Sequence, residues 1–291
     1  MNGWLIVNGF LNSEKFNDLT QLFCEAAKKQ RIQLRVVLNT EQLVTLGMPN
    51  VMQPEERPDF VIFWDKDILL AKYLESLEIP VFNSSSCIEV CDDKRLTHLA
   101  LQKKRLPMPK TVFAPMTYDN IGFTQTDFLS LVEKELSFPM IAKEAFGSFG
   151  QQVYFVRDPQ ELVSLVKSKK STKWLFQEYI QNSKGHDIRL QVVGERVVAA
   201  MHRFNPNDFR ANISNGGNME PYIPTEQEMK LALCAANAVG ASFAGVDLLW
   251  TKTGACVCEV NSNAHFRNLL DCTGVNTADE IIKYIQGVLR K

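Results

Sequence analysis

The first ninety residues alternate short apolar runs with helical patterns, and this alternation limits the possible folds more than any other feature of the chain. Strands are expected at residues 4–7, 35–38, 60–64 and 80–82. A helix from about Glu14 has Ser13 as its expected N-cap and an apolar face made of Phe16, Leu19, Phe23 and Ala26. Strands that alternate with helices predict a parallel α/β layer. This layer lacks the glycine fingerprint of a dinucleotide site, so NAD is not expected here.

The middle of the chain predicts a second unit, which opens with a helix. Asp92 or Asp93 caps this helix, and its apolar residues are Leu96, Leu99 and Ala100. Short strands follow at residues 111–114, 139–145, 153–156 and 174–178, with a helix at 158–167 before the last of them.

The last third predicts another unit, which opens with a hairpin that turns at Gly194-Glu195. Thr225 and Glu228 form a capping box before a helix, and two strands at residues 244–250 and 255–260 follow it. We therefore expect a mixed α/β (α+β) chain with domains at residues 1–91, 92–182 and 183–291.

The strongest chemical signal lies in these last two strands. Asp247 interrupts the apolar segment AGVDLLW, where an acidic residue is unfavourable unless it is paired or bound to a metal. Glu259 and Asn261 are two residues apart, so on a strand they share one face, and an antiparallel neighbour can bring Asp247 beside them. Two carboxylates and an amide oxygen suit Mg²⁺. Taken alone, the pattern also fits a solvated edge strand.

A second signal is a lysine inside an apolar strand, followed by a glycine-rich loop. Lys143 lies in PMIAKEA, and a buried ammonium group needs an anionic partner to keep its proton. The loop through Gly147, Ser148 and Gly150 is small enough to lay backbone N–H groups over phosphates. It is not a Walker loop, because no Gly-Lys-Ser/Thr follows, and alone it fits a plain glycine turn equally well.

Polar residues also gather at the ends of other strands. The strand at 174–178 ends with Gln177 and Glu178, and Tyr179 and Ile180 follow it. This segment can offer backbone groups to an adenine and a carboxylate to a ribose. Further on, Asp187 and Arg189 share a strand face, and after the next strand come Arg203, Arg210 and Asn212. Arginine binds phosphate and carboxylate through paired hydrogen bonds. An exposed strand tip and a solvated charge cluster remain open alternatives.

In their order along the chain, these segments resemble the RimK-like branch of the ATP-grasp ligases, over roughly residues 90 to 265. The segments are Asp93-Lys94, Lys143 with its Gly-Ser loop, Gln177-Glu178-Tyr179-Ile180, Asp187-Ile-Arg189, Asp208-Phe-Arg210-Ala-Asn212, Gly245-Val-Asp247-Leu-Leu and Glu259-Val-Asn261-Ser. The resemblance implies an ATP-grasp fold with an N-terminal Rossmann-like pre-ATP-grasp unit, a central lid domain and a C-terminal ATP-grasp domain.

The resemblance also implies roles for these residues. Lys94 and Lys143 correspond to the lysines that hold the ATP phosphates, and the loop from Gly147 to Gly150 corresponds to the lid. The hinge at residues 177–180 would bind adenine, with Asp187 and Arg189 on the ribose side. The residues implied near the transferred phosphate are Arg210, Asn212 and Arg203. Those implied as ligands of Mg²⁺, or of Mn²⁺, are Asp247, Glu259 and Asn261.

The implied activity is ATP-dependent joining of a carboxylate to an amine through an acyl phosphate, which releases ADP and phosphate. The substrates would be small-molecule or peptide carboxylates and amines. No protein nucleophile is required, and no Gly-x-Ser-x-Gly elbow appears. Three alternatives stay open: a graspetide-type macrocyclising peptide ligase, a kinase for a small acid, and a nucleotide-binding module without turnover.

Composition bears on partners and location. A formal net charge of -1 gives no reason to expect nucleic acid or an anionic membrane as partner. No apolar run reaches the roughly 18 to 20 residues that span a bilayer, and 7 cysteines without a paired framework fit a reducing cytoplasm. ATP-grasp relatives often form dimers or tetramers, so a homo-oligomer is also open. His98 and His186 are expected to face solvent.

The chain departs from the usual family pattern around its substrate pockets. Glu144 follows Lys143 where proline is common, and the loop after Asn212 lacks a basic residue before its glycines. Ser-Asn-Ala-His-Phe-Arg follows Asn261, where relatives often have Ser-Pro and glycines. The glutamate specificity of some relatives is therefore not carried over.

Overall fold

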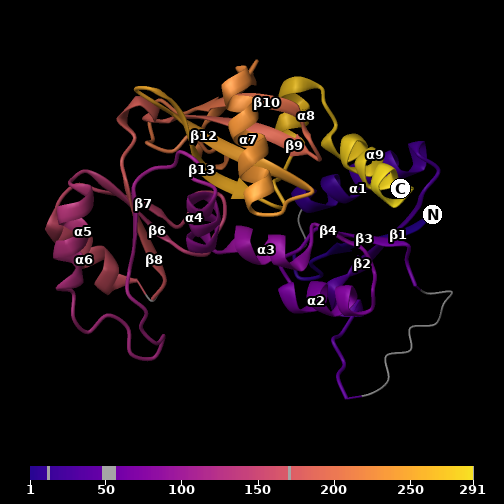
Figure 1. Ribbon diagram of the computed structural model, residues 1–291, viewed down its shortest axis with the longest axis horizontal. Coiled ribbons are helices and arrows are strands. Elements are labelled where there is room, and N and C mark those ends of the chain that lie inside the picture. Colours follow the sequence, from indigo (N-terminus) through magenta and orange to yellow (C-terminus); the bar gives the residue numbers. More distant parts are fainter. Residues whose placement is uncertain (12–13, 48–56, 170–171, 291) are drawn as a thin grey trace.

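The computed structural model describes residues 1–290 except 12–13, 48–56 and 170–171, and it describes no side chain for residues 14–16. The predicted N-cap Ser13 and the side chain of Phe16 thus lie outside the described residues. The described residues form three sheets, one in each third of the chain. These sheets occupy the right, the left and the top of Figure 1.

The N-terminal sheet is parallel, with strand order β2-β1-β3-β4. Its strands are β1 (Asn2–Val7), β2 (Gln33–Leu38), β3 (Phe60–Phe63) and β4 (Val81–Phe82), and its helices are α1 (Glu14–Lys29) and α2 (Ile68–Ser76), with a 3-10 turn η1 (Asn39–Glu41) after β2. Successive residues of a strand face opposite sides. Leu5 and Ile62 therefore join the core formed with α1, whereas Trp4 and Val61 join the core formed with α2. The predicted parallel α/β layer is confirmed.

The central sheet is antiparallel, with strand order β5-β8-β6-β7. Its strands are β5 (Thr111–Phe113), β6 (Met140–Glu144), β7 (Val153–Val156) and β8 (Trp174–Glu178), and its helices are α5 (Phe128–Leu136) and α6 (Pro159–Ser168). Both helices lie on the outer side of the sheet in Figure 1. Ala142 and Phe176 belong to the core under these helices. Alternation along β6 and β8 therefore turns Lys143 and Gln177 to the opposite, inner face.

The C-terminal sheet has strand order β11-β10-β9-β12-β13. Its strands are β9 (His186–Val193), β10 (Arg196–Phe204), β11 (Asn218–Pro221), β12 (Phe243–Thr251) and β13 (Gly254–Asn261), with 3-10 turns η2 (Gln181–Ser183) and η3 (Ile213–Asn215). The predicted hairpin is present as β9 and β10. α7 (Glu226–Ala238) packs on this sheet and begins at the predicted capping box of Thr225 and Glu228.

Two helices link the first and second sheets, α3 (Ser85–Asp92) and α4 (Lys94–Lys103). Asp93 caps α4, as predicted. The apolar residues expected on α4 are not all covered: Ala100 packs against a core, whereas Leu96 and Leu99 are 38% and 54% exposed, and Lys94 and His98 are buried. The polar side of α4 faces inward because it borders the cavity described below, where its polar groups have partners.

The last two helices return the chain to the N-terminal sheet. α8 (Arg267–Thr273) and α9 (Thr277–Leu289) lie close to α1 in Figure 1. Leu269 and Ile281 share a core with Leu5 and Phe23, so the two ends of the chain are packed together. Among the helices that the structure describes, none is long and apolar enough to cross a membrane.

Candidate active site

A cavity of about 250 Å³ lies between the central and C-terminal sheets. The loop after β3 also reaches it, through Trp64 and Lys66. Every site residue predicted from the sequence lines this cavity: Lys94, Lys143, Gly147, Ser148, Gly150, Gln177, Glu178, Tyr179, Ile180, Asp187, Arg189, Arg203, Arg210, Asn212, Asp247, Glu259 and Asn261. The fold thus gathers segments that lie far apart in the sequence.

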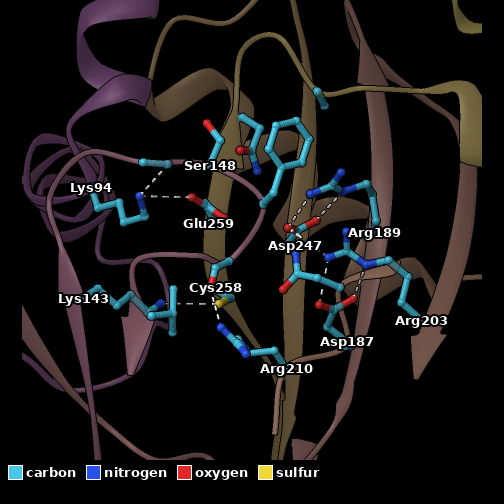
Figure 2. A pocket seen from close by; sticks show the side chains of 18 of the residues that line it. Lys94, Lys143, Ser148, Asp187, Arg189, Arg203, Arg210, Asp247, Cys258 and Glu259 are labelled. Atoms are coloured by element: carbon cyan, nitrogen blue, oxygen red, sulfur yellow. Dashed lines mark hydrogen bonds and ion pairs between the residues drawn. The ribbon is translucent and has the colours of Figure 1, made fainter. Parts of the chain in front are cut away.

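Lys143 enters the cavity from the inner face of β6 and is only 7% exposed. Its Nζ lies 3.8 Å from Sγ of Cys258 (Figure 2). Burial raises the pKa of the Cys258 thiol, so this partner is neutral at physiological pH. No ion pair joins Lys143 to a carboxylate of the residues that the structure describes. The anionic partner expected for this lysine is therefore not supplied by the described part of the chain.

Lys94 is the second buried lysine, at the start of α4. Figure 2 shows that it points, like Lys143, toward the strand that carries Glu259. Its Nζ donates to the carbonyl oxygen of Gly147 at 3.0 Å and lies 3.8 Å from Oε1 of Glu259. Burial lowers the pKa of Lys94, Glu259 opposes this shift, and the ammonium groups of Lys143 and Lys66 add to it.

The glycine-rich loop at 147–150 is held against the C-terminal sheet by its backbone. Arg210 donates from Nη1 to the carbonyl oxygen of Gly150 at 2.6 Å, and Asp208 holds the same guanidinium group at 2.8 and 3.1 Å. Gly150 has φ +71°, and a Cβ there would lie 2.7 Å from Oδ1 of Asn212. Glycine is therefore required at this close approach.

Four charged side chains on three adjacent strands form a chain of ion pairs (Figure 2). Arg189 on β9 donates to both oxygens of Asp247 on β12, each at 2.6 Å. Arg203 on β10 donates to both oxygens of Asp187 at 2.6 and 2.8 Å, and its Nη2 lies 3.0 Å from Oδ2 of Asp247. Burial raises the pKa of Asp187, whereas the two arginines hold the pKa of the buried Asp247 below its usual range. Pairing makes the burial of these charges tolerable.

The three predicted metal ligands lie on the paired strands β12 and β13, as the sequence predicts. Asp247 lies opposite Glu259 across the β12–β13 pair, and Asn261 lies opposite Gly245. Nδ2 of Asn261 is buried without a hydrogen-bond partner among the described atoms. The described residues contain no cluster of three His, Cys, Asp or Glu side chains that could hold a metal. This oxygen set fits a hard cation such as Mg²⁺, although Asp247 already accepts from two arginines.

The hinge is supported by a histidine that was expected to face solvent. His98 is only 2% exposed, which contradicts that prediction. Its Nε2 lies 2.7 Å from Nε2 of Gln177, and its Nδ1 lies 2.7 Å from the carbonyl oxygen of Lys94. Because the amide nitrogen of Gln177 is a donor, Nε2 accepts and Nδ1 donates, which is the neutral form of the ring. Burial, with a contribution from Lys143, lowers the pKa of His98 to about 4.

The cavity lining also includes residues that sequence reasoning did not assign to the site, among them Lys66, His186 and Cys258. Lys66 lies three residues beyond the end of the parallel strand β3, and the carboxyl ends of such strands are where ligands bind, so its position was a usable signal. A β-bulge in β13 turns both Cys258 and Glu259 toward the cavity, which strict alternation does not allow. His186 is half-buried and stacks on His202 with ring centroids 5.2 Å apart, so its predicted exposure is also wrong.

Comparison with known proteins agrees with this geometry. The model of the family described as "RimK-like ATP-grasp domain" matches residues 91–285. The "Uncharacterized protein MG012 homolog" of Mycoplasma pneumoniae is 32% identical over 262 residues, which cover 87% of this chain and 88% of that protein. The "Probable alpha-L-glutamate ligase" of Legionella pneumophila (strain Corby) is 33% identical over 218 residues, which cover 74% of this chain and 70% of that protein.

A solved structure shares the fold over almost the whole chain. The RimK domain protein ATP-grasp from Sphaerobacter thermophilus superposes with a TM-score of 0.74 at 18% identity, covering 98% of this chain and 99% of that one. The predicted fold and family are therefore confirmed. The chain belongs to the RimK-like ATP-grasp family and is an enzyme of the ligase class that forms C–N bonds.

Proposed function

We propose that this enzyme is an ATP-dependent carboxylate–amine ligase, which forms an amide or peptide bond through an acyl phosphate and releases ADP and phosphate. The observation that carries the proposal is Lys143, a buried ammonium group that faces the cavity without a carboxylate partner among the described residues. A buried charge of this kind is unfavourable until an anion pairs with it. The family assignment makes ATP phosphates the natural anion.

The cavity walls support one orientation of the nucleotide. Adenine would lie at the hinge from Gln177 to Ile180, the ribose would lie near Asp187, and the phosphates would lie at Lys94 and Lys143. The carbonyl groups of the lid now accept from Lys94 and Arg210, so the phosphates would replace those carbonyls. The three sheets also support the predicted domains at residues 1–91, 92–182 and 183–291, with the nucleotide held between the last two.

Asp247, Glu259 and Asn261 would hold Mg²⁺, with Mn²⁺ as an alternative. The bound cation would supply positive charge against the phosphate oxygens. Asp247 would have to share its oxygens with Arg189, or release that arginine, because both oxygens are occupied in the present arrangement.

Arg210, Asn212, Lys143 and the loop at 147–150 would stabilise the transferred phosphoryl group and exclude water from it. Arg210, which Asp208 holds in place, would contact the transferred phosphoryl group together with Asn212, and Lys143 would offset its charge. The loop at 147–150 would exclude water from the acyl phosphate, which otherwise hydrolyses. The amine then attacks the acyl phosphate directly, so the reaction requires no protein nucleophile.

The seven free cysteines support the predicted cytoplasmic location.

The test is phosphate release from Mg·ATP with a panel of amino acids and short peptides, with products read by mass. The proposal predicts ADP and phosphate only when an acid and an amine are both present, with a product lighter by one water than their sum. Formation of AMP and pyrophosphate would overturn the acyl-phosphate route. A hydroxamate formed with hydroxylamine would identify the acyl phosphate and separate a ligase from a simple kinase.

A further inference from the structure

Lys66 brings a third ammonium group to the lid, from a part of the chain outside the matched family segment. Its Nζ lies 3.4 Å from Oγ of Ser148, while Lys94 donates to the carbonyl oxygen of the adjacent Gly147. One lysine from the loop after β3 and one from the start of α4 therefore contact consecutive residues of the loop at 147–150. The ion-pair partner of Lys66 is Asp92, at 2.5 Å.

The backbone of Lys66 is fixed relative to the predicted metal site. The carboxylate of Asp65 accepts from the backbone N–H of Lys66 at 2.7 Å and from Nδ2 of Asn8 at 3.2 and 3.3 Å. Nδ2 of Asn263 donates to the carbonyl oxygen of Asp65 at 2.9 Å. Asn263 is two residues beyond Asn261, so one short loop positions both a metal ligand and Lys66.

The distribution of charge at the lid favours an anion with several negative oxygens. Lys66, Lys94 and Lys143 line one cavity. Glu259 lies 3.8 Å from Lys94 and is itself a predicted metal ligand, whereas Lys143 has a polar contact with the thiol of Cys258 and forms no ion pair with another described residue. Like charges gather in this way where an anionic ligand binds.

Topology assigns the lysines to different points along the nucleotide. Lys143 is on β6, which pairs directly with the hinge strand β8, and Lys94 begins the helix whose His98 contacts Gln177 of the hinge. Both lysines are thus linked to the hinge by one strand pairing or one side-chain contact, and Lys94 also lies 3.8 Å from Glu259, so the two can meet the phosphate chain along its length. Lys66 comes from the N-terminal sheet and belongs with the loop after Asn261, toward the end where phosphoryl transfer would take place.

We propose that Lys66 binds the terminal phosphoryl group of ATP and so makes the enzyme discriminate between ATP and ADP. The inference rests on the proposed function only in taking ATP as the ligand. Because the Lys66 side chain is 45% exposed, its charge-assisted hydrogen bond would have a strength near the lower end of the usual range. Its loss should weaken binding of the triphosphate about tenfold.

The test measures equilibrium affinity by calorimetry, with Mg·AMP-PNP and Mg·ADP as probes. The variants are Lys66→Met, Lys66→Arg and, as the matched control, Lys72→Met. Lys72 also forms one ion pair, with Glu89 at 2.7 Å, and its side chain is 47% exposed. We expect Lys66→Met to weaken AMP-PNP binding about tenfold and to leave ADP affinity within about twofold of wild type. Lys66→Arg should keep most of the discrimination between AMP-PNP and ADP. Lys72→Met should change neither affinity.

Equal weakening of both nucleotides by Lys66→Met, or no change in either, would overturn the inference. The second result would instead favour a carboxylate of the acid substrate as the group that Lys66 meets. If wild-type protein binds neither nucleotide, the proposed function and this inference fail together. A selective loss for AMP-PNP, found in an enzyme that shows no acid–amine turnover, would support the inference while the ligase proposal fails.

Discussion

His98 should remain neutral far below the ordinary histidine pKa, because its surroundings accept only one protonation state. Gln177 presents an amide N–H to Nε2, and the same amide nitrogen donates to Oγ1 of Thr111 at 2.9 Å. A proton on Nε2 of His98 would therefore face the N–H donor of Gln177. Rotating the Gln177 amide by 180° would break its hydrogen bond to Oγ1 of Thr111. The ring is also buried, and Lys143 adds repulsion. Burial, followed by the charge of Lys143, lowers the pKa from 6.5 to about 4.

The lowered pKa links the protonation of His98 to stability. The unfolded chain binds this proton more readily than the folded chain, so the contribution of His98 to stability is complete above about pH 6.5 and is lost as the pH falls toward 4. The difference between 6.5 and about 4 corresponds to about 3 kcal/mol in total. About 2 kcal/mol of that should be lost between pH 7 and pH 5.

The direct assay is an NMR titration of protein labelled at histidine. The resonance that is missing from His98→Gln identifies His98 among the four histidines, and it should titrate near pH 4. In denaturant unfolding, the stability advantage of wild type over His98→Gln should shrink by about 2 kcal/mol between pH 7 and pH 5. A His98 resonance that titrates near 6.5, or a stability difference independent of pH, would refute the reasoning.

Four further substitutions, one of them with a matched control, test the site and the core. Lys143→Ala or Glu259→Ala should each reduce turnover by about 100-fold or more in ADP-release assays with little change in melting temperature, and normal activity in either pure variant would contradict the assignment. Gly150→Ala should raise the KM for ATP about tenfold, because its Cβ would lie 2.7 Å from an amide oxygen at φ +71°. Gly216→Ala is the matched control, since φ is +85° there but nothing lies within 4 Å. Trp174→Ala removes a fully buried ring and should cost about 3 to 5 kcal/mol in urea unfolding.

Much of the fold was predictable because its signals are local. The alternating strands and helices of the first ninety residues, the capping box at Thr225 and the hairpin turn at Gly194 all depend on neighbours within a few residues. The presence of Asp247 and Lys143 in the cavity lining was predictable for a related reason, because a charged residue inside an apolar strand requires a partner.

The errors arise where distant segments decide the environment. Leu96 and Leu99 are apolar residues of α4, but the cavity beside this helix supplies partners for its polar face and leaves those leucines exposed. The burial of His98 depends on Gln177, which lies 79 residues away in the chain. The missed Cys258 depends on a bulge in β13, and local sequence carries no signal for that irregularity.

During synthesis, the N-terminal sheet leaves the ribosome long before the residues that complete its core. Phe23 and Phe60 pack with Phe266 and Ile281, which follow roughly 200 residues later. At ordinary elongation rates this interval is about 10 to 40 s. For that time the face under α1 exposes apolar side chains to the cell, so the nascent N-terminal third is the segment on which chaperones would act. Translation pauses before α8 should therefore raise aggregation more than pauses within the last helix.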